Sequence, residues 1–220
     1  MVTSPVEHLL HRIERAVLGG VRIVQLRDKK ATDDVLHGLG LEIVRLLTHL
    51  EKKGHSCSFV VNDRVRVAKE LMCGLHLGWE DLLSYADVSE QCLTPSLWRQ
   101  LEDTLVCIRA SLPKESLLGL TIHDRLEIAQ ILGGELNYVG VGPIFQTNTK
   151  KDTKAVLGVE HFRTLVKKSS VPVVGIGGIS TLNISELKGA EAKALAMCSV
   201  FFTQEDPFSV AQELLKNLLV

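Results

Sequence analysis

Short apolar segments alternate with amphipathic segments along almost the whole chain. The apolar segments are brief enough to be buried strands, and they span residues 21–26, 58–62, 75–77, 117–122, 138–144, 171–176 and 194–199. The amphipathic segments have helical spacing, and they span residues 5–18, 32–52, 65–72, 124–132, 159–168, 182–187 and 207–218. Asp206, directly before Pro207, is a predicted N-cap for the last of these helices.

This alternation predicts a parallel sheet. Strand, helix and strand make a right-handed crossover, which leaves the carboxyl ends of all strands on one face. A chain of 220 residues has the size of one small eight-stranded α/β barrel. We therefore predict an α/β fold, a (β/α)8 TIM barrel that forms a single domain over residues 1–220. Because only residues 1–4 precede the first helix, we expect the first strand to be truncated.

The stretch over residues 84–115 is too long for a simple crossover. We predict a helix over residues 96–105 and a short extra strand at residues 106–109. The stretch follows the fourth strand of the barrel, near its open end. We therefore expect an insertion of roughly twenty residues that shapes access to the site or forms a homodimer contact.

The charge balance and the cysteines narrow the class of protein. Lys and Arg total 25 against 26 Asp and Glu, so the charge does not indicate binding to nucleic acid or to an anionic membrane surface. The five cysteines form no CxxC pair, which favours reduced thiols over disulfides or a zinc site. The sequence contains neither the roughly 18-residue apolar run of a membrane helix nor a signal-peptide pattern. We expect a cytoplasmic protein.

Two carboxylates follow neighbouring strands. Asp63 comes directly after the strand at residues 58–62, and Asp81 follows the strand at residues 75–77. Both are therefore expected at the open end of the barrel. Magnesium is usually held by one or two carboxylates together with phosphate oxygens. We predict Mg²⁺ at Asp63 and Asp81; the alternative is that each carboxylate caps the helix that follows it.

Groups suited to phosphate also lie at the carboxyl ends of predicted strands. Gln25, Arg27 and Lys29 alternate, so we expect an inward polar column in which the two cations hold a phosphate group. The loop after the fifth predicted strand adds two hydroxyls and a lysine. Gly178 and Ser199 follow the last two strands, where barrels commonly bind phosphate. Two phosphate sites indicate two phosphorylated small-molecule substrates.

Six motifs, taken together and in this order, resemble those of the thiamine phosphate synthase family. They are QLRDK at residues 25–29, VNDR at 61–64, HLGWED at 76–81, GLTIH at 119–123, YVGVGPIFQTNTK at 138–150 and VVGIGGI at 173–179. The resemblance extends from about residue 21 to the carboxyl end. It implies a transferase on a barrel with bound Mg²⁺. Such an enzyme joins hydroxymethylpyrimidine diphosphate to a thiazole phosphate carboxylate, which forms thiamine phosphate and releases pyrophosphate.

The same resemblance implies a role for each site residue. Mg²⁺ would be bound by Asp63 and Asp81. The pyrimidine diphosphate would be bound by Gln25, Arg27, Lys29, Asn62, Thr121 and Lys150. The thiazole phosphate would be bound by Thr147, Thr149, Gly178, Cys198 and Ser199. The residues implied in catalysis are Arg27, Thr121 and Lys150, with Lys150 neutralising the leaving pyrophosphate. Because the implied reaction is dissociative, the protein would compensate charge and position the substrates rather than act as acid or base.

Two other functions fit parts of the sequence. A thiazole tautomerase has the same fold, but it commonly uses a histidine near the position of Pro143 and has little use for the charged residues above. A phosphate-binding barrel without activity is the second alternative, and the complete charged set argues against it. We expect His76 and His123 to be hydrogen-bonded core or rim residues, because the implied chemistry needs no general base.

Overall fold

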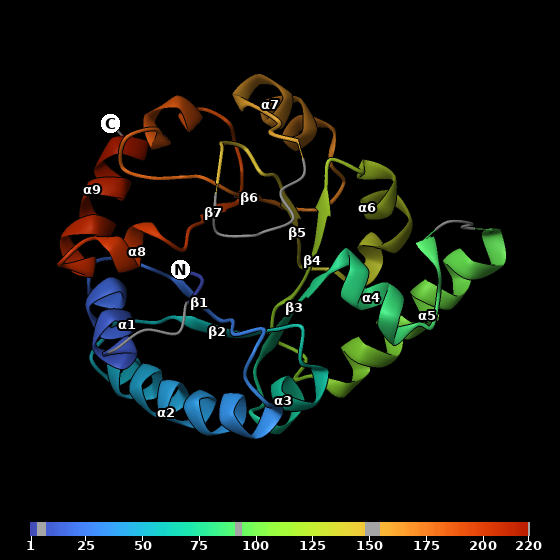
Figure 1. The fold of residues 1–220 in the computed structure, drawn as a ribbon, viewed down its shortest axis with the longest axis horizontal. Helices are drawn as coiled ribbons and strands as arrows, with labels where there is room; N and C mark the ends of the chain where they lie inside the picture. The colour runs from blue at the N-terminus through green and yellow to red at the C-terminus, as the bar shows by residue number, and fades with distance from the viewer. Residues whose placement is uncertain (4–7, 91–93, 148–154, 220) are drawn as a thin grey trace.

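The computed structural model describes residues 1–3, 8–90, 94–147 and 155–219. Seven parallel strands form one sheet in sequence order, and the sheet curls into a ring surrounded by helices (Figure 1). The strands are β1 (Ile23–Leu26), β2 (Ser58–Asn62), β3 (Gly74–Gly78), β4 (Leu118–His123), β5 (Tyr138–Val141), β6 (Val173–Ile176) and β7 (Ala194–Ala196). All seven strands that the hydrophobic pattern predicts are therefore present.

Two strands end earlier than predicted. β5 ends at Val141 rather than at residue 144, because Pro143 has no N–H group to donate to a neighbouring strand. β7 ends at Ala196 rather than at residue 199. The chain then turns into the short helix α8 (Val200–Thr203), which the sequence analysis did not predict.

The helices cover the outside of the sheet (Figure 1). They are α1 (Leu9–Leu18), α2 (Asp33–Lys52), α3 (Val65–Glu70), α4 (Trp79–Tyr85), α5 (Pro95–Ser111), α6 (Leu126–Leu132), α7 (Val159–Lys168), α8 and α9 (Pro207–Leu219), with 3-10 turns at η2 (Gly133–Glu135) and η3 (Ile184–Leu187). The predicted cap of α9 is confirmed, since the Asp206 carboxylate accepts from the N–H groups of Phe208 and Ser209, each at 3.2 Å. None of the helices in the described ranges is long and apolar enough to cross a membrane.

The long stretch after β3 holds α4 and α5. The predicted extra strand at residues 106–109 is wrong, because these residues lie inside α5. The buried residues Leu101, Leu105 and Ile108 keep helical spacing through this segment, so one apolar face continues to pack inward. The β-branched Val106 on its own suggested a strand, yet its side chain is 44% exposed.

The first three residues lie between the two edges of the sheet. The N–H of Val2 donates to the carbonyl of Met197, just after β7, at 2.8 Å. On the other side, the N–H of Thr3 donates to the carbonyl of Gln25 at 2.8 Å, and the N–H of Gln25 donates to the carbonyl of Met1 at 2.9 Å. The described part of the predicted strand stub, residues 1–3, therefore connects β7 to β1 through backbone hydrogen bonds.

Candidate functional site

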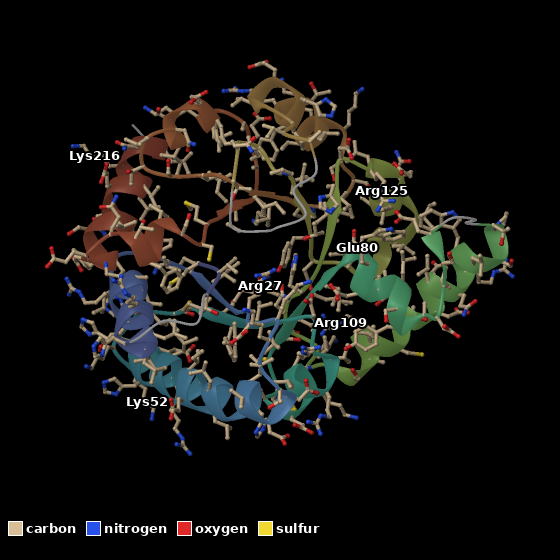
Figure 2. All side chains as sticks on the ribbon, in the orientation of Figure 1. Arg27, Lys52, Glu80, Arg109, Arg125 and Lys216 are labelled. Atoms are coloured by element: carbon tan, nitrogen blue, oxygen red, sulfur yellow. The ribbon has the colours of Figure 1, made fainter. Side chains whose placement is uncertain are left out.

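A cavity of about 490 Å³ runs through the middle of the ring. Eight residues that the sequence analysis assigned to substrates line it together: Gln25, Arg27, Asn62, Thr121, Thr147, Gly178, Cys198 and Ser199. They come from six of the strands or from the loops that follow them, and Figure 2 shows Arg27 directed into the ring. Thr149 and Lys150 lie outside the described residues. The parallel topology thus brings most of the predicted substrate residues to one cavity.

Asp63 and Asp81 form a carboxylate pair at the same end of the ring. Asp63 follows β2 in a left-handed backbone conformation, with a φ of 65°, and Asp81 lies in the first turn of α4. The Asp81 carboxylate lies close enough to share a hydrogen bond with Asp63 when one of the two is protonated. Gly78 permits this approach, because a Cβ atom there would lie 2.5 Å from the Asp81 Oδ2 atom.

The environment of Asp63 favours its protonated form. Burial, and then the hydrogen bond and charge of Asp81, raise the pKa of Asp63 to about 6, against the opposing effects of Lys29 and the Gly78 N–H. The capping alternative is wrong for both carboxylates, since Arg64 is the N-cap residue of α3 and Gly78 is that of α4. The negative charges of two adjacent carboxylates repel each other, and a bound cation would offset this repulsion.

These oxygen ligands suit a hard divalent cation. Within the described part of the chain, no group of three or more His, Cys, Asp or Glu side chains could hold a metal ion. Asp63 and Asp81 could therefore hold Mg²⁺ only with further oxygens from water or a substrate, which is the usual arrangement for Mg²⁺ at phosphate sites.

The predicted inward column is correct for two of its three members. Gln25 and Arg27 line the cavity, but Lys29 does not. The side chain of Lys29 is 57% exposed, and its Nζ atom lies 3.6 Å from the Asp63 Oδ2 atom. Because β1 ends at Leu26, strand alternation no longer determines where Lys29 points.

The loops after β5 and β6 pack on each other. The N–H of Ile144 donates to the carbonyl of Ile176 at 2.9 Å, and that of Phe145 to the carbonyl of Gly177 at 3.1 Å. Gly178 has a φ of 70°, and a Cβ atom there would lie 2.5 Å from the Gln146 carbonyl oxygen. Position 178 therefore requires glycine. The packing of the two loops brings Gly178 and Thr147 to the same wall of the cavity.

Cys198 and Ser199 extend this wall beyond β7. The Sγ atom of Cys198 lies 3.8 Å from the carbonyl oxygen of Thr3, and the hydroxyl of Thr3 accepts from the N–H of Arg27 at 2.9 Å. Burial raises the pKa of the Cys198 thiol, while the positive charge of Arg27 opposes this change. Arg27 therefore lies near the Cys198 wall of the cavity.

The sequence analysis missed a buried polar network in the same cavity. His76 Nδ1 lies 3.0 Å from the Tyr138 hydroxyl, and His76 Nε2 lies 2.8 Å from the Thr121 hydroxyl. The expectation that His76 is a hydrogen-bonded core residue or a rim residue is confirmed in its first form, but its partners were not predicted and Tyr138 was given no role. A signal was present, because His76 is the one polar residue within the otherwise apolar β3, Gly74–Gly78. Such a residue needs a polar partner when it is buried.

Comparisons with known proteins identify the family of the chain. A family model described as thiamine monophosphate synthase matches residues 1–97 and 100–201. The matched residues include most of the stretch 84–115. The insertion of roughly twenty residues that we expect in this stretch stays a prediction.

Curated relatives named thiamine-phosphate synthase align over nearly the whole chain. The protein of Nostoc punctiforme is 33% identical over 99% of this chain and 55% of its own length. That of Prochlorococcus marinus strain AS9601 is 32% identical over the same shares, and that of Lactococcus lactis is 28% identical over 97% of this chain and 89% of its own length. The chain thus spans about half the length of the cyanobacterial relatives.

A solved structure has the same fold. The thiamine phosphate pyrophosphorylase of Pyrococcus furiosus superposes with a TM-score of 0.74 over 99% of this chain and 93% of its own, at 24% identity. The Bacteroides thetaiotaomicron protein of the same name gives a TM-score of 0.58 over 98% and 94%, at 18% identity. At these identities the likeness supports the fold.

Proposed function

Because the chain belongs to the thiamine monophosphate synthase family, we propose that it is the synthase itself. It joins 4-amino-5-hydroxymethyl-2-methylpyrimidine diphosphate to a thiazole phosphate or its carboxylate, and thiamine phosphate and pyrophosphate are the products. The observation that carries this proposal is one cavity, lined by Arg27, Thr121 and Gly178, in a ring whose same end carries the paired carboxylates Asp63 and Asp81, which are not part of the cavity lining. That combination suits a diphosphate leaving group next to a second phosphate.

We also infer that the sheet is a closed eight-membered barrel. Residues 1–3 act as its first strand, since they donate and accept backbone hydrogen bonds with Gln25 of β1 and donate one to Met197 just after β7. Closure matters for function because it holds the Arg27 and Cys198 walls of the cavity together, through the contacts of Thr3 with both.

Asp63 and Asp81 would hold Mg²⁺ together with diphosphate oxygens, and the ion would neutralise charge that develops on the leaving group. Arg27, Lys29, Asn62 and Thr121 would bind and orient the diphosphate. Lys150 would neutralise the departing pyrophosphate. The thiazole phosphate would be bound by Thr147, Gly178, Cys198 and Ser199 of the cavity wall and by Thr149.

The bond between the pyrimidine methylene carbon and the diphosphate oxygen breaks first, and its electron pair leaves with pyrophosphate. The resulting cation is stabilised by the electron-rich aminopyrimidine ring, which Gln25 orients. The thiazole nitrogen then donates its electron pair to the methylene carbon. The protein contributes charge compensation and positioning, which are effective because the donors are already in place in a buried cavity.

Pro143 and the charged residues argue against a thiazole tautomerase. Pro143 lines the cavity where a tautomerase would need a proton-transferring histidine. A tautomerase also has no diphosphate to explain the pairing of Asp63 with Asp81 or the placement of Arg27. The same residues argue against an inactive phosphate-binding barrel.

The proposal is tested by incubation with both phosphorylated precursors and Mg²⁺, followed by an assay for thiamine phosphate. Omission of either precursor should abolish the product.

A second measurement is thermal unfolding with Mg²⁺ and pyrophosphate. At about 100 times its dissociation constant, pyrophosphate should stabilise the wild type by about 3 kcal/mol, and Asp63→Ala should lose this effect. Asp103→Ala, which removes an exposed carboxylate of α5, is the control and should respond like the wild type. Equal responses of Asp63→Ala and wild type would refute the metal assignment.

A further inference from the structure

Four polar side chains form a hydrogen-bonded chain across the inside of the ring. The side chain of Gln25 on β1 contacts the Tyr138 hydroxyl of β5. Tyr138 contacts His76 Nδ1 of β3 at 3.0 Å, and His76 Nε2 contacts the Thr121 hydroxyl of β4 at 2.8 Å. All four residues line the cavity, and His76, Thr121 and Tyr138 are 8%, 3% and 8% exposed. We call these four residues the relay.

The surrounding backbone leaves space for the relay. A Cβ atom at Gly119 would lie 2.2 Å from the Tyr138 ring, and one at Gly140 would lie 3.0 Å from the Thr121 Oγ1 atom. The rings of His76 and Tyr138 are stacked, with centroids 5.5 Å apart and planes inclined by 18°. The two glycines thus leave the space in which the His76 and Tyr138 rings stack. This packing determines the orientation of both rings.

The direction of proton donation along the relay follows from the anionic ligand expected at its Thr121 end, because an anionic oxygen can only accept a hydrogen bond. Burial raises the pKa of the Tyr138 phenol, so the phenol keeps its proton. The Tyr138 O–H can then donate to His76 Nδ1. Neutral imidazole carries one proton, which is left on Nε2 and is donated to the Thr121 oxygen. The Thr121 O–H is therefore available to donate into the cavity.

We propose that His76 and Tyr138 are positioning residues that act through Thr121. They hold its oxygen as an acceptor on the His76 side, so that its proton points to an anionic oxygen of the diphosphate. The anionic ligand, and with it the direction of donation, rests on the proposed function, whereas the contacts of the relay do not. With the opposite direction Thr121 would donate to His76, and its lone pairs would face the negatively charged ligand.

The direction is tested on the unmodified protein without substrate. Nitrogen-15 NMR distinguishes the two neutral tautomers of histidine, and loss of one signal set in His76→Gln assigns His76 among the eight histidines. We expect the proton on Nε2. A proton on Nδ1 would overturn the proposal, whatever the enzyme catalyses.

The coupling to Thr121 is tested by a double-mutant cycle. Tyr138→Phe keeps the stacked ring and removes only the hydroxyl, and it should lower kcat/KM for the pyrimidine diphosphate about five- to tenfold. In a Thr121→Val background the same change should cost less than about twofold, because the residue that it positions is already lost. An equal cost in both backgrounds would show that Tyr138 does not act through Thr121.

A conservative pair at His76 separates positioning from packing. The amide of His76→Gln can reach the place of Nε2 and donate to Thr121, whereas the shorter amide of His76→Asn can replace only the Nδ1 contact. We expect the Gln variant to retain several-fold more activity than the Asn variant. Equal activities, or the reverse order, contradict the proposal.

Failure of the proposed function can be told apart from failure of the relay. If the wild type forms no thiamine phosphate, the function is wrong. The relay is then tested in two other ways. One is the tautomer of His76. The other is the same double-mutant cycle, in which the measured quantity for each variant is the shift in Tm produced by inorganic pyrophosphate with Mg²⁺.

Discussion

At the scale of single residues, identity alone says little about the behaviour of a side chain in this cavity. Asp63 and Asp81 are both carboxylates at strand ends, yet burial next to Asp81 raises the pKa of Asp63 to about 6. His76 is one of eight histidines, and its position between Tyr138 and Thr121 distinguishes it. In each case the neighbours decide the chemistry, and they come from other strands.

The raised pKa of Asp63 predicts an unusual dependence of stability on pH. The folded protein binds a proton here more tightly than the unfolded chain, so stability without metal should fall as the pH rises from about 4 to about 6. The loss attributable to this group is at most about 3 kcal/mol. Asp63→Asn should remove this part of the slope in urea unfolding at a series of pH values, while Asp103→Asn should keep it. Parallel curves for wild type and Asp63→Asn would contradict the assignment.

Gly119 should tolerate no side chain. A Cβ atom there would lie 2.2 Å from the Tyr138 ring, so Gly119→Ala must displace the phenol from His76. We expect a loss of about 1–3 kcal/mol in the free energy of unfolding and a decrease in kcat. Gly134→Ala is the control, because a Cβ atom there has no neighbour within 4 Å. Chemical denaturation of both variants decides whether the packing at Gly119 is as tight as described.

At the scale of elements, each helix depends on its ends as well as on its apolar face. Asp206 caps α9 and also accepts from Arg15 of α1, with an Nε to Oδ1 distance of 3.0 Å. The guanidinium of Arg15 lies over the ring of Phe208 at 5.0 Å. These contacts join the first and last helices of the ring, where they lie side by side (Figure 1).

Loss of the Asp206 cap should destabilise the protein. We expect Asp206→Ala to cost about 1 kcal/mol, since Ala leaves the first N–H groups of α9 without an acceptor. Asp206→Asn keeps a capping oxygen and should retain most of that stability. Thermal unfolding would contradict this view if the two variants lost the same amount, because the ion pair with Arg15 would then matter more than the cap.

At the scale of the whole molecule, residues 1–3 connect the two edges of the sheet. An open edge would leave backbone groups of β1 and β7 without partners inside the protein, at a cost in free energy. The same three residues contact both walls of the cavity through Thr3. Closure of the ring and the shape of the cavity are therefore expected to be linked.

Val2→Pro tests this link, because proline removes the N–H that donates to Met197. We expect a loss of about 1–3 kcal/mol in the free energy of unfolding, since the Met197 carbonyl loses its donor. Hydrogen exchange at the Gln25 N–H should become faster. Val2→Ala keeps the N–H and should behave like the wild type. Unchanged exchange at Gln25 in the proline variant would indicate that the ring closes without this bond.

Local patterns in the sequence determined the order of strands and helices. The helix at residues 159–168 and the strand at residues 58–62 were predicted with the observed bounds, because their periods and end signals agree. Local patterns failed where two signals compete. The β-branched Val106 suggested a strand inside α5, and the alternation from Gln25 to Lys29 was extended beyond the end of β1. The approximate place of Asp63, Asp81 and Arg27 at strand ends was also predictable, since parallel strands end on one face.

The sequence by itself thus determined which elements form and which end of the sheet carries the chemistry, because periodicity and residue type are local properties. Only the tertiary structure decided which side chains meet. The pairing of Asp63 with Asp81, the redirection of Lys29 to Asp63, and the relay from Gln25 to Thr121 join residues from different strands. Their distances and pKa values depend on the curvature of the sheet and on the space that glycines such as Gly119 leave, and no local pattern encodes either.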